Sequence, residues 1–401
     1  MMQGVKILYT KFGLLIVGVV ALPLLFSFLR LSKTSEQDSK GLSDVLQAKI
    51  HACKKQGSRN DCYQQLAFHL LDTASLKDVL GELQGLEEAT PSNQEDYFAC
   101  HKLTHYLGQG AYTRLQSVPA VYASCNMTCG GGCYHGALEA YFGSRFGKQY
   151  DTADDKVLVA ATVTICGKKE NYPQKGLYHQ CIHGLGHALM FITDGDLPRS
   201  LRFCDALSSD DQRLCYAGAF MENAGSTTDN LAHPARFLAE DDPFYPCDAL
   251  PEKYLHTCYT LQSIHFTIIS KYDFTKAADL CNRVPDPYHV DCFLALGGIQ
   301  VYSIQEPERI KAGCAIIADA GYRNECIKGV VLYLSSRYGD DTRRYMDNFC
   351  SIVDNENKEG CYRQMGKVLT LWARNESELK SFCDELKEDR HIAWCQQGVY
   401  D

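Results

Sequence analysis

Cysteines recur along this chain at a nearly constant interval, and each of them opens an apolar stretch with helical spacing. Examples are CYQQLAFHLL from Cys62, CIHGLGHALM from Cys181 and CFLALGGIQVY from Cys292. Cysteines of this kind stand at positions 62, 100, 133, 181, 215, 258, 292, 326, 361 and 395, so that six of the nine intervals are 33 to 35 residues. A fixed period of this length is typical of a repeat protein in which each unit is one helical hairpin.

Most of these cysteines follow a second cysteine, from which they are separated by polar turn residues such as DALSSDDQRL and NRVPDPYHVD. We therefore expect one disulfide within each hairpin, and closing so short a loop contributes roughly 2 to 3 kcal/mol to stability. Zinc fingers are the alternative, but the CxxC pairs that they need are absent. The expected disulfides are Cys53–Cys62, Cys166–Cys181, Cys204–Cys215, Cys247–Cys258, Cys281–Cys292, Cys314–Cys326, Cys350–Cys361 and Cys383–Cys395.

Four cysteines do not follow this spacing. Cys100 has no upstream partner, and Cys125, Cys129 and Cys133 lie together in CNMTCGGGCYHG. Three pairings among the four exist, and the sequence does not choose among them. Each pairing bonds Cys100 to the later group, so each would tether the helix at Cys100 to the next one.

A period of 34 with paired cysteines around each turn resembles the disulfide-stapled, cysteine-rich relatives of tetratricopeptide repeats. By spacing, the resemblance covers about residues 46 to 401. It implies an all-α fold, an α/α solenoid of about ten helical hairpins of about 34 residues, with a concave surface built from equivalent helices. Such proteins mostly bind partners, so the resemblance implies a protein or peptide on the concave face and no particular reaction.

The N-terminal region predicts a membrane anchor. The stretch FGLLIVGVVALPLLFSFL at residues 12–29 carries no charge over 18 positions, and a spanning helix needs about 17 to 25 such residues. We expect a short cytoplasmic N-terminus at 1–11, an uncleaved transmembrane signal anchor at 12–29, a linker at 30–45 and the repeat domain at 46–401. A cleaved signal peptide is the alternative.

The 20 cysteines and the net charge of −9 limit the compartment and the partners. Paired cysteines belong in an oxidising compartment, which predicts a single-pass membrane protein with its body in a periplasm, a lumen or the cell exterior. The scattered Lys and Arg residues do not form the basic face of a nucleic-acid-binding protein. Triplets at Asn126 and Asn375 match the glycosylation pattern, but such short patterns often arise by chance.

Three consecutive repeats each carry two metal-competent side chains four residues apart, which places both on one face of a helix. Counted from the cysteine that starts each helix, these pairs stand at +1 and +5 or at +2 and +6, so they face the same region of a solenoid. Glu222, at +7 of the following repeat, would complete the set. The expected metal ligands, within about residues 98–223, are His101, His105, His135, Glu139, His183, His187 and Glu222.

Seven ligands exceed what one ion takes and suit two ions held a few ångströms apart. Imidazole with carboxylate is compatible with Fe, Cu, Zn or Mn. We expect two transition-metal ions, Fe or Cu ahead of Zn or Mn, in an oxidative enzyme such as a hydroxylase or oxygenase. In a hydrolytic enzyme, Glu139 or Glu222 would be the catalytic general base instead of a ligand.

The arrangement is similar to deoxyhypusine hydroxylase, in which repeat helices supply His and Glu to a di-iron centre. The adjacent His-Glu pairs of that family are missing here, so the similarity extends to architecture and not to substrate or reaction. The alternative function is a non-enzymatic repeat scaffold that binds proteins or peptides, with a metal that is structural or absent. Metal content separates the two hypotheses, because the enzyme should carry two ions.

Overall fold

The computed structural model describes residues 46–56, 59–89, 94–146, 155–225, 236–239, 241–304, 306–339 and 342–401. The chain divides into two units, residues 1–55 and 56–401, and in the first unit residues 46–54 are helical. The N-terminus, the anchor expected at 12–29 and the linker at 30–45 lie outside the described residues. Within the described ranges, no helix combines the length and the apolar character that crossing a bilayer requires.

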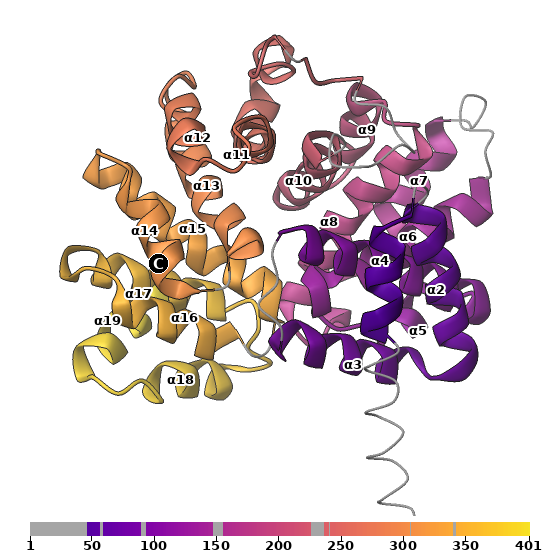
Figure 1. Cartoon of the computed structure of the whole chain (residues 1–401), viewed down its shortest axis with the longest axis horizontal. Coiled ribbons are helices and arrows are strands. Elements are labelled where there is room, and N and C mark those ends of the chain that lie inside the picture. The colour runs from indigo at the N-terminus through magenta and orange to yellow at the C-terminus, as the bar shows by residue number, and fades with distance from the viewer. Residues whose placement is uncertain are drawn as a thin grey trace, which may run out of the picture. The chain divides into compact units, whose positions relative to one another are not determined.

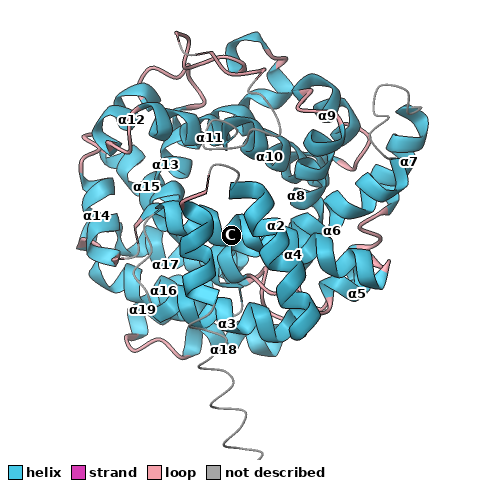
Figure 2. Cartoon of the chain, turned by 45° about the vertical axis from the view of Figure 1, so that its right-hand side comes forward, coloured by secondary structure: helices cyan, strands magenta, loops and turns pink. Residues whose placement is uncertain are grey.

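The described part of the second unit consists of helices joined by turns (Figure 2). Each of its long helices contains one of the repeating cysteines, and consecutive long helices pack against one another. This confirms the all-α repeat organisation. The long helices are α2 (Arg59–Thr73), α4 (Gln94–Leu115), α6 (Thr128–Phe146), α8 (Lys175–Ile192), α10 (Ser209–Gly225), α11 (Glu252–Ile269), α13 (His289–Ser303), α15 (Ala320–Tyr338), α17 (Asn355–Leu369) and α19 (Asp389–Tyr400).

Shorter helices lie between the long ones and complete the hairpins. Several begin at a side-chain cap: Asp196 accepts a hydrogen bond from the backbone N–H of Arg199, and Asn375 accepts one from that of Glu378, which satisfies an otherwise unpaired donor. The short helices are α3 (Leu76–Ala89), α5 (Val118–Tyr122), α7 (Asp155–Thr164), α9 (Leu197–Cys204), α12 (Phe274–Cys281), α14 (Pro307–Ala315), α16 (Thr342–Ile352) and α18 (Glu376–Asp384), with 3-10 turns η1 (Lys169–Asn171) and η2 (Cys247–Ala249).

Buried disulfides cross-link the hairpins. They join Cys166–Cys181, Cys204–Cys215, Cys247–Cys258, Cys281–Cys292, Cys314–Cys326, Cys350–Cys361 and Cys383–Cys395. Cys53 and Cys62 are disulfide-bonded as well, and the described residues include no free cysteine. The four irregular cysteines pair as Cys100–Cys129 and Cys125–Cys133. The first of these bonds ties α4 to the start of α6.

Paired long helices approach so closely that the contact has room only for glycine. A Cβ on Gly108 of α4 would lie 2.1 Å from the carbonyl oxygen of Cys133, and a Cβ on Gly136 of α6 would lie 1.9 Å from that of His105. The same reciprocal contact recurs between α8 and α10, between α13 and α15, and between α17 and α19. These glycines therefore set the short distance at which side chains of neighbouring repeats face one another.

The repeats follow one another along a curved path (Figure 1), and late repeats return to contact early ones. Helix α15 packs against α6, and α13 against α4. The ring of Tyr97 stacks on that of Tyr302 with centroids 4.7 Å apart, and the buried guanidinium of Arg337 pairs with the Glu87 carboxylate at 3.1 Å. The array of the second unit is thus closed on itself by specific contacts.

Candidate metal centre

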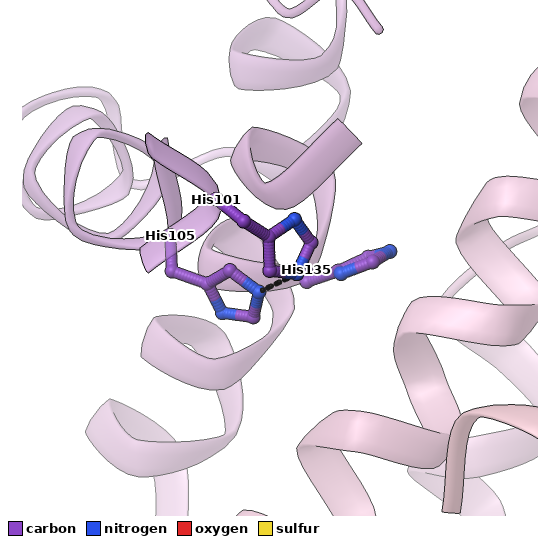
Figure 3. Close-up of side chains that lie close together, drawn as sticks. All are labelled: His101, His105 and His135. Atoms are coloured by element: carbon purple, nitrogen blue, oxygen red, sulfur yellow. Dashed lines mark hydrogen bonds between the residues drawn. The ribbon is translucent and has the colours of Figure 1, made fainter. Parts of the chain in front are cut away.

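Five histidines from three neighbouring helices form one cluster. They make two groups of three that share His135, and within each group one nitrogen from each ring lies within 4.8 Å of the others. The first group is His101 and His105 of α4 with His135 of α6, drawn in Figure 3. The second group is His135 with His183 and His187 of α8. The structure therefore brings all five predicted histidines together.

Within each helix, the two histidines have the separation of a chelating pair. The Nε2 atoms of His101 and His105 are 3.1 Å apart (Figure 3), and those of His183 and His187 are 3.2 Å apart. With metal–nitrogen bonds of about 2.0 to 2.1 Å, such a separation corresponds to an angle of about 100° at a shared ion. This angle lies between those of square-planar and tetrahedral coordination.

In each pair of histidines, a glutamate accepts a hydrogen bond from Nδ1 of one ring and so fixes that ring. Nδ1 of His105 donates to Oε1 of Glu139 at 2.9 Å, and Nδ1 of His187 donates to Oε2 of Glu222 at 2.9 Å. Because a carboxylate accepts this hydrogen bond, Nδ1 carries the proton and Nε2 keeps its lone pair. A metal-binding histidine is generally held in this way by a second layer of acceptors.

Backbone groups fix the other two histidines. Nδ1 of His101 donates to the carbonyl oxygen of Cys129 at 2.7 Å, and the ring of His183 hydrogen-bonds to the backbone of Leu214. In neutral rings fixed like this, the two Nε2 atoms of each pair face each other with lone pairs. Their close approach is repulsive unless a cation lies between them.

An unusual turn at the start of α6 orients the Cys129 carbonyl toward His101. Cys129, Gly130 and Gly131 have φ angles of 51°, 73° and 77°, in the left-handed region that favours glycine. The Cys100–Cys129 disulfide holds the same turn to α4, next to His101. The two glycines and the disulfide thus serve to position the first histidine pair.

His135 lies at the centre of the cluster and has no hydrogen-bond partner on either ring nitrogen within the described part of the chain. The residue is 2% exposed, and burial of an unpaired polar nitrogen is costly. His265 of α11 also has two unpaired ring nitrogens, but it belongs to neither group of ligand atoms. The position of His135, shared by two groups of histidines, is therefore what distinguishes it from His265 as a candidate ligand.

Electrostatics favour the neutral imidazole at three of the five histidines. Burial, followed by repulsion from neighbouring histidines, lowers the pKa of His101 to about 3 and holds the pKa values of His135 and His183 well below the ordinary value. Rings that stay neutral at pH 7 have a free lone pair, which is the form that binds transition metals.

Both glutamates are ionised. Burial opposes ionisation of Glu139, but the interaction with His105, which donates a hydrogen bond to it, outweighs burial and lowers the pKa of Glu139 to about 2. The pKa of Glu222 is lowered in the same way by His187. The second oxygen of Glu139 accepts from Nε2 of Gln109 at 2.7 Å. The glutamates, expected as ligands or general bases, thus lie behind the imidazoles and outside both groups of ligand atoms.

Three supporting groups were not singled out in the sequence: Gln109, the Cys129 carbonyl and the Leu214 backbone. Of these, only Gln109 could have been recognised from the sequence, because it stands four residues after His105 and so lies on the same helix face. The backbone groups carry no residue-type signature and depend on how the helices pack.

The chain matches no protein-family model, no curated protein and no solved structure. No family is identified. What the site binds and does must therefore follow from its own geometry.

Proposed function

We propose that this protein is an extracytoplasmic metalloenzyme with a dinuclear centre held by His101, His105, His135, His183 and His187. The observation that carries the proposal is the close approach of two Nε2 atoms in each histidine pair, at 3.1 and 3.2 Å, beside His135, whose own nitrogens have no partner in the described residues. Each ion would take three imidazoles, which leaves a coordination position open for a reactant.

Copper fits this donor set best. Imidazole suits Cu, Zn, Fe and Ni, and copper binds most strongly in the Irving–Williams order. Non-haem iron centres that activate oxygen commonly include a carboxylate ligand, whereas Glu139 and Glu222 are engaged with histidines here. We therefore place copper ahead of iron, with zinc as the redox-inactive alternative.

The geometry supports oxidative over hydrolytic chemistry. In many hydrolytic centres a general base assists the metal-bound water, but here both oxygens of Glu139 are occupied by His105 and Gln109, and Glu222 accepts a hydrogen bond from His187. Bound copper would supply one-electron chemistry and an affinity for oxygen. The chain itself keeps His101, His135 and His183 neutral, orients His105 and His187 through the two carboxylates and limits the access of water by burial.

The scaffold and its compartment are part of the proposal. The many disulfides support an oxidising location, and the uncharged segment at 12–29 would anchor the repeat domain to the membrane. The resemblance to cysteine-rich tetratricopeptide-like proteins concerns this architecture. A scaffold that binds peptides on a concave face has less support, because early and late repeats contact each other through residues such as Tyr97 and Tyr302.

Metal analysis and redox cycling of the full-length protein test the proposal. We expect two copper ions per chain, loss of copper in His183→Ala, and retention in His69→Ala, since His69 is exposed and outside the cluster. Anaerobic reduction by ascorbate should bleach the Cu(II) spectrum, and admission of oxygen should restore it. Folded wild-type protein that binds no metal on reconstitution would refute the metal centre. Bound copper that does not cycle would refute the oxidative function.

A further inference from the structure

His135 differs from the other four histidines in what its second nitrogen contacts. His101, His105 and His187 each have Nδ1 bound to a protein acceptor, and His183 bonds to the Leu214 backbone. These rings therefore have one nitrogen left for a metal. His135 has both nitrogens free of protein partners in the described residues.

Resting on the proposed metal centre, we propose that His135 bridges its two ions as an imidazolate, with one ring nitrogen bound to each ion. Such a bridge holds the ions about 6 Å apart, as the bond lengths and the width of the ring require. This is farther than the few ångströms expected from ligand number alone.

Ring positions support the bridge on both sides. The centroid of His135 lies 5.6 and 5.2 Å from those of His101 and His105, and 5.5 and 4.6 Å from those of His183 and His187. Two imidazoles on one ion have centroids about 5 Å apart at ordinary bond lengths. His135 therefore has the spacing of a co-ligand toward each pair.

The orientation of the ring fits the same role. In Figure 3 one nitrogen of His135 lies on the side of His101 and His105, and the ring extends away so that the other nitrogen is at the far end. Gly184 of α8 provides room for this ring, because a Cβ there would come within 3.0 Å of Cδ2 of His135. The ring thus extends away from the first histidine pair, while its centroid is 4.6 Å from that of His187 in the second pair.

Bridging changes the proton content of the site without oxidation or reduction. The first ion binds the lone pair of neutral His135. The second metal–nitrogen bond forms where the ring N–H bond breaks, and the proton passes to the solvent. Because the imidazolate is bonded to both ions, unpaired electrons on two Cu(II) ions become magnetically coupled.

Electron paramagnetic resonance of Cu(II)-loaded full-length protein tests this coupling. We expect two Cu(II) ions per chain by elemental analysis, a low-temperature signal that accounts for much less than the copper present, and a half-field transition on warming. Two ions with a full-intensity, uncoupled signal would overturn the bridge while leaving the metal centre intact. One ion per chain would also overturn it. Protein that binds no metal would refute the proposed function itself.

A pair of variants assigns the coupling to His135. In His135→Gln one side chain can no longer join two ions, so we expect loss of one of the two ions or an uncoupled spectrum of full intensity. His265→Gln is the matched control, since His265 is similarly buried with two unpaired nitrogens but lies outside the cluster. It should retain two coupled ions. Coupling that survives in His135→Gln would overturn the assignment.

Discussion

Two histidines on opposite sides of the cluster are held in the same way. His105 has Glu139 on its Nδ1, and His187 has Glu222, both at 2.9 Å. An ionised partner on Nδ1 fixes the orientation of the ring and makes its other nitrogen a stronger ligand. Each glutamate should therefore control the affinity for one ion more than for the other.

Replacing either glutamate by glutamine should weaken the binding of one metal ion. Glutamine can still accept the hydrogen bond but carries no charge, so we expect Glu139→Gln to raise the dissociation constant of one ion about 10- to 100-fold. Glu222→Gln should do the same for the other ion. Competition with a chelator of known affinity measures both constants. Glu252→Gln, on an exposed residue of α11, is the control, and equal constants in all three variants would contradict the orienting role.

At the level of residues, the sequence identified the metal-competent side chains but not the partner of each ring nitrogen. Spacing of four places His101 with His105 and His183 with His187, and in the structure the Nε2 atoms of the two pairs are 3.1 and 3.2 Å apart. Counting from the cysteines matched His135 with His183. The structure leaves His135 without a second ligand on its own helix, because Glu139, four residues later, is hydrogen-bonded to His105, and His135 is shared by both groups of histidines.

At the level of elements, the contact between α4 and α6 determines whether the histidines meet. Gly136 lies against the carbonyl oxygen of His105, so Gly136→Ala should push the helices apart and cost about 1 to 3 kcal/mol. It should also lower metal affinity. Thermal unfolding and chelator competition measure the two effects.

Gly143 of the same helix is the matched control for this substitution. A Cβ there would be 3.7 Å from the nearest atom, on Phe191, so Gly143→Ala should be neutral or slightly stabilising, as alanine favours the helix. If both variants unfolded at the same temperature and kept the same affinity, close approach of the helices would not be what positions the site.

The Cys100–Cys129 disulfide should matter for both stability and metal binding. It closes a loop with a sequence separation of 29, for which chain entropy predicts a loss of about 3 to 4 kcal/mol when the bond is removed. The double variant Cys100→Ser with Cys129→Ser should also free the turn at Cys129, which holds His101, from helix α4. The affinity for one metal ion should therefore fall. The double variant Cys383→Ser with Cys395→Ser, far along the chain, should lose stability and keep its metal.

The sequence predicted long elements well and local irregularities poorly. Apolar helical spacing and the period of 34 indicated helices such as α13 and α15, because that pattern is local. It did not indicate the left-handed turn at Cys129–Gly131, whose conformation depends on a disulfide partner 29 residues away.

At the level of the whole second unit, closure of the array was not predicted. The period indicates that each repeat is a helical hairpin. The curvature of the array comes from small rotations between neighbouring repeats, which the period does not encode. Contacts such as Gln174 with the Trp372 carbonyl, at 2.8 Å across 198 residues, have no counterpart in a local pattern.

Arg337 is the residue on which we expect closure to depend most. Its side chain is fully buried, lies between the rings of Tyr97 and Tyr338, and donates through Nε to Glu87 at 3.1 Å. Arg337→Met would leave the Glu87 carboxylate buried without its cation, which costs about 3 to 5 kcal/mol. Thermal unfolding should show this loss, and hydrogen exchange should rise in α4, α6, α13 and α15.

Two further variants separate loss of the ion pair from general damage. Adding Glu87→Gln to Arg337→Met removes the uncompensated charge and should recover part of the stability, because a polar amide is less costly to bury than a carboxylate. Arg363→Met removes an exposed ion pair with Asp401 and should change little, since solvent screens such pairs. If Arg337→Met were as stable as Arg363→Met, closure of the array would have to rest on the aromatic and backbone contacts instead.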